Sequence, residues 1–133
     1  MHAGLIIAGP SVWQRAVDGR LGGRRVPFEE LLRRGRLTAP GAVFARVLAG
    51  LDVPSRAEQV RCWAMAAPPL AHSRETWLAA GDLGAHLRRL GVDLDPIGHH
   101  LAALCIREQC PIWSFDPAWD AAVQHLPIRR FDP

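Results

Sequence analysis

The sequence predicts an α/β fold, a three-layer α/β/α sandwich whose mostly parallel central sheet has about four to five strands. Short runs of consecutive apolar residues alternate along the chain with longer segments in which apolar residues recur at helical spacing. Runs without polar alternation are typical of strands buried on both faces of a parallel sheet. Because the connections are short and 133 residues is an ordinary domain size, we expect a single domain over residues 1–133.

The first half of the chain is expected to hold two strands, at residues 5–8 and 36–39. The first strand ends at Gly9-Pro10, and Ser11 then stands where a helix N-cap is expected. Gly and Arg dominate residues 19–25, which predicts a loop. The expected helices of this half cover residues 12–17, 27–34, 42–49 and 54–67, the last of which ends at a Pro-Pro pair.

Most of the second half is expected to be helical. Asp95 directly precedes a proline and is a natural N-cap for one of these helices. In residues 73–90 the apolar residues recur at the spacing of a helix that packs through one face. The expected helices cover residues 73–90, 96–106 and 117–125. The expected strands cover residues 111–115 and 128–131, with residues 70–71 as a minimal fifth strand.

The composition excludes several classes of protein. No apolar run approaches the roughly 20 residues of a membrane-spanning helix. The first four residues lack the basic segment of a secretory signal, so we expect a cytoplasmic protein without membrane association. The cysteines, Cys62, Cys105 and Cys110, fit no disulfide or zinc pattern and are expected to be buried or half-buried thiols.

The basic residues are all arginines, and they crowd the early segment 15–36. Arginine binds phosphate in a bidentate manner, so this cluster, with Arg24 and Arg25 at its centre, is a candidate contact for RNA phosphates. A solvated helix–loop face, partly offset by Glu29 and Glu30, explains the same cluster equally well.

Four short segments carry a resemblance to a known family. They are Leu-Ile-Ile-Ala-Gly-Pro-Ser-Val-Trp at residues 5–13, Phe-Ala-Arg-Val-Leu-Ala-Gly-Leu at 44–51, Gly-His-His-Leu-Ala-Ala at 98–103, and Cys-Pro-Ile-Trp-Ser-Phe-Asp at 110–116. In this order and at this spacing the chain resembles the PIN domain, the small ribonuclease fold of many bacterial toxin–antitoxin toxins. The resemblance spans nearly the whole chain and implies the same α/β/α architecture.

The family usually supplies four acids to a metal site, and the matching positions here are Gly9, Arg46, Gly98 and Asp116. Only Asp116 is acidic. Mg²⁺ and Mn²⁺ prefer oxygen ligands and need well-placed carboxylates. We therefore expect no metal cofactor and no metal-dependent catalysis, with Asp116 the one ligand if any metal binds.

Arg46 at a family acid position reverses the local charge. Two unit charges at ~4 Å interact by roughly 4 kcal/mol at an effective dielectric constant near 20, so the replacement disfavours a cation strongly. Arg46 is expected to face the same pocket and to pair with Asp116. Together with amide groups at the helix start near Ser11, it is also a candidate phosphate-binding residue.

Nearby acids offer an alternative catalytic set, formed by Asp95, Asp116 and Asp120. Asp95 lies one helical turn before the third family position, and Asp120 follows Asp116 by four residues. The competing interpretations are an N-cap for Asp95 and an exposed helix position for Asp120. Adjacent helical residues such as His99 and His100 point about 100° apart, so they do not readily chelate one metal ion. One of them is a candidate for metal-free acid–base catalysis beside Asp116.

Three functions follow from these observations. The first is a PIN-like protein with a dismantled metal site that binds RNA phosphates or a protein partner. The second is an active Mg²⁺- or Mn²⁺-dependent ribonuclease toxin that uses the relocated acids, and the third is a structural subunit paired with a competent relative. The resemblance implies an antitoxin-like partner and a homodimer, for which Trp63, Met65 and Trp77 are the candidate surface.

Overall fold

The centre of the computed structural model, which describes residues 4–133, is a parallel sheet of three strands. The middle strand β1 (Ile6–Ala8) pairs with β2 (Leu37–Thr38) on one edge and with β3 (Ile112–Trp113) on the other. A single bridge from β3 to Arg130 extends the parallel pairing beyond the third strand. All three strands are buried, as their uninterrupted apolar runs predict.

The expected fourth and fifth strands are not formed as strands. The backbone of residues 128–131 bonds β3 at Ile112, whose N–H and C=O make hydrogen bonds of 2.9 and 2.7 Å with Arg129 and Phe131. A tight turn uses the N–H of Ile128 just before this point and bends the chain away from an extended course. Residues 70–71 also form no strand, because the carbonyl of Ala71 accepts a hydrogen bond from the Arg107 side chain.

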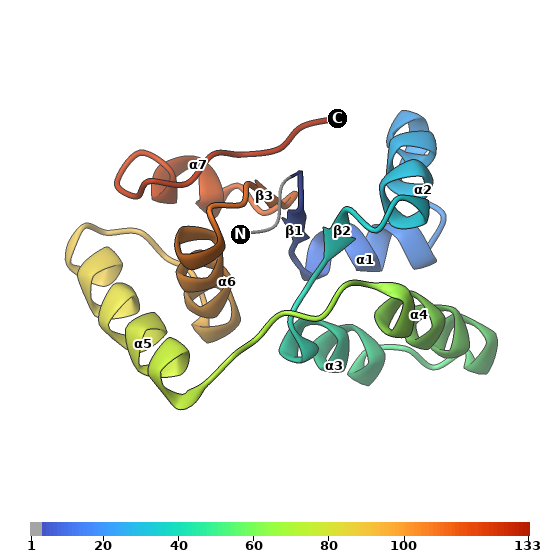
Figure 1. Cartoon of the computed structure of the whole chain (residues 1–133), viewed down its shortest axis with the longest axis horizontal. Coiled ribbons are helices and arrows are strands. Elements are labelled where there is room, and N and C mark those ends of the chain that lie inside the picture. The colour runs from blue at the N-terminus through green and yellow to red at the C-terminus, as the bar shows by residue number, and fades with distance from the viewer. Residues whose placement is uncertain (1–3) are drawn as a thin grey trace.

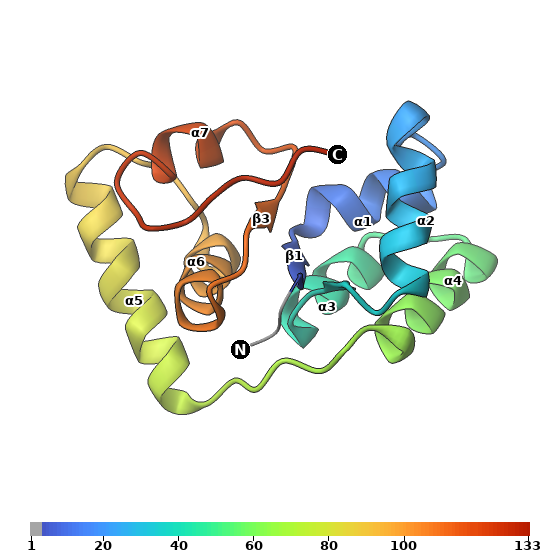
Figure 2. The same cartoon turned by 45° about the horizontal axis from the view of Figure 1, so that its top comes forward.

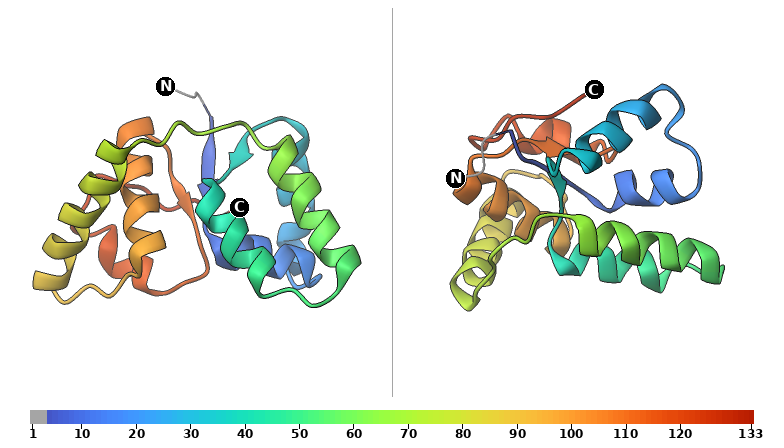
Figure 3. Two further views of the ribbon diagram at one scale, coloured as in Figure 1. Left: turned by 90° about the horizontal axis from the view of Figure 1, so that it is seen from below. Right: turned by 45° about the vertical axis from the view of Figure 1, so that its right-hand side comes forward.

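Helices cover both faces of the sheet and complete the three layers. In chain order they are α1 (Pro10–Val17), the 3₁₀ helix η1 (Gly22–Arg24), α2 (Arg25–Arg33), α3 (Gly41–Ala49), α4 (Pro54–Ala66), α5 (Arg74–Arg89), α6 (Pro96–Glu108) and α7 (Ala118–Ala122). The pair α5 and α6 lies on one side of the strands, and α1, α3 and α4 pack together on the other (Figures 1 and 3). Figure 2 shows α7 on the side of α5 and α6, and α2 on the side of α1 and α4.

Most of the expected helix boundaries are confirmed, but the start of α1 is different. Asp95 caps α6 as predicted, accepting a hydrogen bond of 2.8 Å from the Gly98 amide. In contrast, α1 begins at Pro10, whose missing N–H suits the first helical turn, and the N-cap is Gly9. Ser11 is therefore already inside the helix, and its hydroxyl bonds the segment after β3 instead of the helix end.

The expected loop at residues 19–25 also contains more structure than predicted. Its middle forms η1, and α2 begins directly afterwards at Arg25. Gly19 and Gly22 adopt positive φ angles of 68° and 57°, which favour glycine, so the turns still depend on the predicted glycines.

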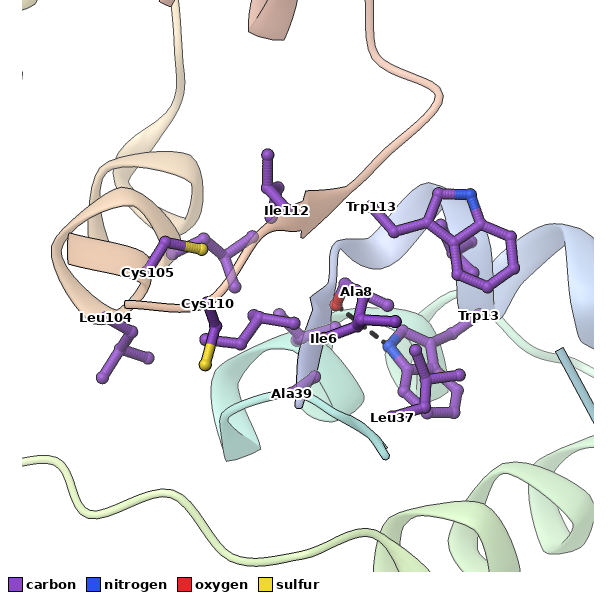
Figure 4. Packing of buried hydrophobic residues seen from close by; sticks show 14 of the residues in the cluster. Ile6, Ala8, Trp13, Leu37, Ala39, Leu104, Cys105, Cys110, Ile112 and Trp113 are labelled. Carbon is purple, nitrogen blue, oxygen red and sulfur yellow. Dashed lines mark hydrogen bonds between the residues drawn. The ribbon is translucent and has the colours of Figure 1, made fainter. Parts of the chain in front are cut away.

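Aromatic residues from four helices and β3 fill the core between α1, α2, α3 and α4. Trp13 is fully buried, and its ring centroid lies 5.6 Å from that of Phe28 and 4.9 Å from that of Phe44. The indole N–H of Trp13 donates to the Ala8 carbonyl at 3.1 Å and so ties α1 to the end of β1 (Figure 4). Trp63 packs edge-on against Phe28 at 5.2 Å and belongs largely to this core.

Cys105 and Cys110 are buried as predicted, whereas Cys62 is exposed because α4 buries little of its surface.

Of the three residues expected to form a dimer surface, Met65 and Trp77 are exposed, but Trp63 packs inward. None of the helices in the described chain is long and apolar enough to cross a bilayer. The expectation that the first four residues are not a secretory signal rests partly on residues 1–3, which lie outside the described residues.

Replacing Trp13 with Phe should lower the free energy of unfolding by about 2 kcal/mol. The change removes the hydrogen bond to Ala8 and leaves part of a fully buried ring unfilled. Urea unfolding followed by far-UV circular dichroism measures the loss. Met65→Ala, at a position that is 86% exposed, is the control and should change stability by less than about 0.5 kcal/mol. Equal stabilities of the two variants would contradict this account of the core.

Candidate functional site

A pocket of about 340 Å³ opens where α1, α3 and α6 meet the segment after β3. It lies beyond the carboxyl ends of β1 and β3, where open parallel sheets place their ligands. The lining residues are Pro10, Ser11, Gln14, Arg46, Val47, Leu94, Asp95, Gly98, Leu101, Ser114, Asp116 and Trp119. We call this the strand-end pocket.

The strand-end pocket brings the four family positions together. Arg46, Gly98 and Asp116 line it directly, and Gly9 stands immediately before the lining residue Pro10. Four elements deliver these positions: the N-cap of α1, the last turn of α3, the first turn of α6 and the segment after β3. The correspondence deduced from short sequence landmarks therefore describes real neighbours in space.

Arg46 pairs with Asp95 and not, as expected, with Asp116. Its guanidinium forms an ion pair with one oxygen of Asp95 across the strand-end pocket, while the other oxygen accepts the Gly98 amide hydrogen at 2.8 Å. Both carboxylate oxygens of Asp95 are thus engaged. The expectation was wrong because capping holds Asp95 at the start of α6, where it faces the last turn of α3.

The same contacts shift the ionisation of Asp95. Burial by itself raises the pKa of this carboxyl, but the Gly98 amide and the Arg46 guanidinium outweigh burial, and His99 adds a smaller favourable charge. The net result is a pKa below the ordinary value. Asp95 therefore stays ionised, and its pair with Arg46 stays closed, throughout the neutral range.

Asp116 has a different environment. Its backbone N–H donates to the Ser114 hydroxyl at 3.1 Å, and its carboxylate accepts the Ala118 amide hydrogen at 3.0 Å. The Ser11 hydroxyl accepts from the Phe115 amide at 2.9 Å and lies 3.3 Å from the Ser114 hydroxyl. These bonds fix the turn after β3 and leave Asp116 as the exposed carboxylate of the strand-end pocket, with no cation at ion-pair distance among the described residues.

The third acid of the alternative set lies elsewhere. Asp120 forms an ion pair with Arg130 and lines a different pocket from Asp95 and Asp116. The predicted set Asp95, Asp116 and Asp120 is therefore not assembled in one place. Over residues 4–133 no three His, Cys, Asp or Glu side chains gather closely enough to hold a metal ion, and the donors present do not fit Mg²⁺ or Mn²⁺.

No protein-family model matches the chain, and no curated protein does. Solved structures do match. The chain is similar to VapBC2 from Rickettsia felis, whose crystal structure contains a DNA fragment from the VapBC2 promoter. The TM-score is 0.71, and the match covers 96% of this chain and 99% of that chain. The fold is PIN-like. Because only 14% of the aligned residues are identical, the similarity concerns the PIN-like fold alone.

Arg24 and Arg25, the other two candidate phosphate-binding residues, lie outside the strand-end pocket. Arg24 forms an ion pair with Asp132 at 3.4 Å, and Arg25 pairs with Glu29 at 2.6 Å and donates to a backbone carbonyl. Both follow the carboxyl end of α1, whereas the pocket lies at the amino end of that helix. Of the proposed phosphate-binding residues, the PIN-like fold therefore groups only Ser11 and Arg46.

Neither histidine of the His99-His100 pair reaches Asp116. His99 packs against α5 so closely that a side chain at Gly84 would overlap its ring. His100 is buried between α5 and α6, where its ring stacks on Trp77 at 3.7 Å with an interplanar angle of 10°. Both ring nitrogens of His100 lack a hydrogen-bond partner in the described chain. Sequence periodicity gave no sign of this stack, because Trp77 lies on the neighbouring helix.

Replacing Asp95 with Ala should destabilise the protein more than replacing Arg46 with Ala. The first change removes the N-cap of α6 as well as the ion pair and should cost about 1–2 kcal/mol. The second removes a half-exposed ion pair and should cost less than about 1 kcal/mol. Denaturant titrations at pH 7 compare them. A larger loss from Arg46→Ala would show that the ion pair, and not the cap, holds Asp95 in place.

His100 should make the protein less stable as the pH falls. Burial, with His72 and Arg107 nearby, lowers the pKa of His100 from 6.5 to about 4. Between these values the unfolded chain binds a proton that the folded chain does not, so stability is lost from about pH 6.5 down to about pH 4. The loss over this window should be on the order of 2 kcal/mol.

The variant His100→Phe keeps a ring against Trp77 but cannot titrate. Urea unfolding at several pH values should show a weaker pH dependence for this variant than for the natural chain. His125→Gln changes an exposed histidine outside the contact between α5 and α6 and serves as the matched control, with the pH dependence retained. Parallel stability profiles for the natural chain and His100→Phe would contradict the assignment.

Proposed function

We propose that this PIN-like protein acts by binding and not by metal-dependent cleavage, as a member of a toxin–antitoxin-type pair. The observation that carries the proposal is the ion pair between Arg46 and Asp95, which spans the pocket where the family holds its metal. The resemblance of the sequence to PIN toxins and the structural similarity to VapBC2 support the toxin–antitoxin part. The proposed partner is an antitoxin-like protein.

The charges of the strand-end pocket oppose a divalent cation. Gly9 and Gly98 supply no ligand, and the oxygens of Asp95 are already bonded to Arg46 and to a backbone amide. A divalent cation ~4 Å from the guanidinium would meet a repulsion of roughly 8 kcal/mol in a medium of effective dielectric constant ~20. One free carboxylate does not offset this repulsion and the loss of bound water.

The pocket is also a poor site for RNA phosphate. The Arg46 guanidinium already donates to Asp95. The charged side chains of the pocket are Arg46, Asp95 and Asp116, and their net charge is negative. Apolar side chains, among them Val47, Leu101 and Trp119, make up much of the wall. A mixed polar and apolar lining of this kind suits a protein segment better than a phosphate group.

The alternative is an active ribonuclease, and one observation favours it. Asp95 and Asp116 line the same pocket, so two of the three acids of the alternative catalytic set lie close together. Metal binding would then require Arg46 to leave Asp95. The two functions therefore differ in whether the natural chain responds to Mn²⁺.

The double variant Gly9→Asp with Arg46→Glu should gain a response to Mn²⁺ that the natural chain lacks. A Cβ atom at Gly9 would meet the Ser114 hydroxyl at 3.5 Å, an ordinary contact, so aspartate fits there. Gly98 is left unchanged, because a Cβ atom there would lie 3.1 Å from that of Leu94. At a Mn²⁺ concentration of ~100 times Kd the stabilisation would reach about 2.7 kcal/mol, a shift of several degrees in Tm.

Thermal melting with and without Mn²⁺ measures this response. The matched control Gly9→Asn with Arg46→Gln has nearly the same shape without the added carboxylates and should not respond. Stabilisation of the natural chain by Mn²⁺, with RNA cleavage that Asp116→Ala abolishes, would refute the proposal and establish the ribonuclease. A silent double variant would show that the strand-end pocket is not the family metal site.

A further inference from the structure

Helix α5 lies at one edge of the molecule and is held there mainly by α6. Irregular segments join it to the rest of the chain, residues 67–73 before it and 90–95 after it (Figure 1). The buried residues of α5 are Thr76, Ala80, Gly84 and Leu87. Only Leu87 among them has a large apolar side chain. A helix that buries so little apolar surface separates from its neighbour more easily than a helix of the core does.

The ring of His100, from α6, lies under the ring of Trp77, from α5. The two ring centroids are 3.7 Å apart, and the interplanar angle is 10°. His100 is 1% exposed and Trp77 is 41% exposed, so the indole separates the imidazole from solvent. Neither ring nitrogen of His100 has a hydrogen-bond partner within residues 4–133. Water therefore reaches this imidazole when α5 moves away from α6.

A proton on His100 would destabilise the closed contact between the two helices. An imidazolium has two N–H donors, and neither would have an acceptor here. His72, from the segment before α5, and Arg107, from α6, add positive charge beside the ring, while α5 contacts it through the uncharged Trp77. The indole face attracts a cation, but this attraction is weaker than the cost of burying a charge without hydrogen bonds.

We propose that the stack of His100 on Trp77 is a pH-sensitive latch, and that protonation of His100 releases α5 from α6 while the sheet and the core around Trp13 stay folded. Arg107 also holds the start of α5, through the Thr76 hydroxyl at 2.9 Å and a backbone carbonyl, but these groups do not titrate in mild acid. The pH dependence of the contact therefore comes from His100. The latch goes beyond the proposed function, since neither ring lines the strand-end pocket.

The opening of α5 should become about 30-fold more favourable between pH 7.5 and pH 5. Burial, with His72 and Arg107 nearby, lowers the pKa of His100 from 6.5 to about 4 in the closed form, whereas the open form exposes the imidazole to water. Acid in this range therefore draws the equilibrium toward the open form. Hydrogen exchange of the full chain, followed by mass spectrometry, measures the protection factors of the α5 amides after correction for the intrinsic exchange rate at each pH. These factors should fall by the same ratio.

Low concentrations of urea distinguish local opening of α5 from unfolding of the whole chain. A local opening exposes little surface, so exchange in α5 should depend weakly on urea, whereas exchange in α1 and α3 should depend on it steeply. Protection of α5 should also be lower than that of α1 and α3 at each pH. Equal protection and equal urea dependence in the three helices would overturn the proposal, because α5 would then open only with the whole fold.

Two variants test the stack itself. His100→Phe keeps a ring under Trp77 without a titratable group, so it should retain the protection of α5 at pH 7.5 and lose most of the fall at pH 5. Trp77→Ala removes the cover of the imidazole and should lower the protection of α5 already at pH 7.5, with a weaker pH dependence. This second variant keeps the test decisive if His100→Phe does not fold. Leu78→Ala, at a neighbouring position that is 64% exposed, is the matched control and should keep the natural pH dependence.

His99 is the second histidine between these helices, and its ring packs against Gly84 of α5. The variant His99→Gln should keep the natural pH dependence of α5 protection. Loss of that dependence in His99→Gln, or its persistence in His100→Phe, would overturn the assignment to His100. Constant protection of α5 from pH 7.5 to pH 5 in the natural chain would refute the latch. None of these outcomes depends on Mn²⁺ or on a partner protein.

Discussion

β1 is paired on both edges and buried on both faces, and the strand-end pocket is arranged around its carboxyl end. Because the strand has only three residues, its position is reinforced from the side by the hydrogen bond between the Trp13 indole and the Ala8 carbonyl. The same bond sets the direction in which α1 leaves the sheet. The chain turns at Gly9-Pro10, and the strand-end pocket begins at that turn.

The strand-end pocket joins side chains from four parts of the chain. At the four positions that the sequence resemblance assigns to acids stand one guanidinium, two glycines and Asp116. Asp95, which caps α6, pairs with the guanidinium and leaves Asp116 as the carboxylate of the pocket without a cation at ion-pair distance in the described residues. Capping, a local requirement of α6, thereby determines the electrostatics of a site built from four elements.

The arginine-rich surface is less uniformly positive than its composition indicates. Glutamates one helical turn away hold most of the arginines of α2, which is the arrangement expected of a solvated helix face. Arg15 departs from it because it lies over the Phe115 ring, which attracts the cation without neutralising its charge, whereas Arg24 contacts both this ring and Asp132. The distribution of acids, and not the number of arginines, therefore determines where an anion would be held.

Local patterns in the sequence were sufficient for the fold class, the three central strands, most helix boundaries and the Asp95 cap, since each depends on residues within one or two helical turns. The family landmarks also identified the four positions that meet in the strand-end pocket. Three features required the tertiary structure: the pairing of Arg46 with Asp95, the turning of the Ser11 hydroxyl toward the segment after β3, and the separation of Arg24 and Arg25 from the pocket. Each joins or separates residues on different elements. The packing of helices on the sheet decides such contacts, and the spacing of residues along the chain does not specify that packing.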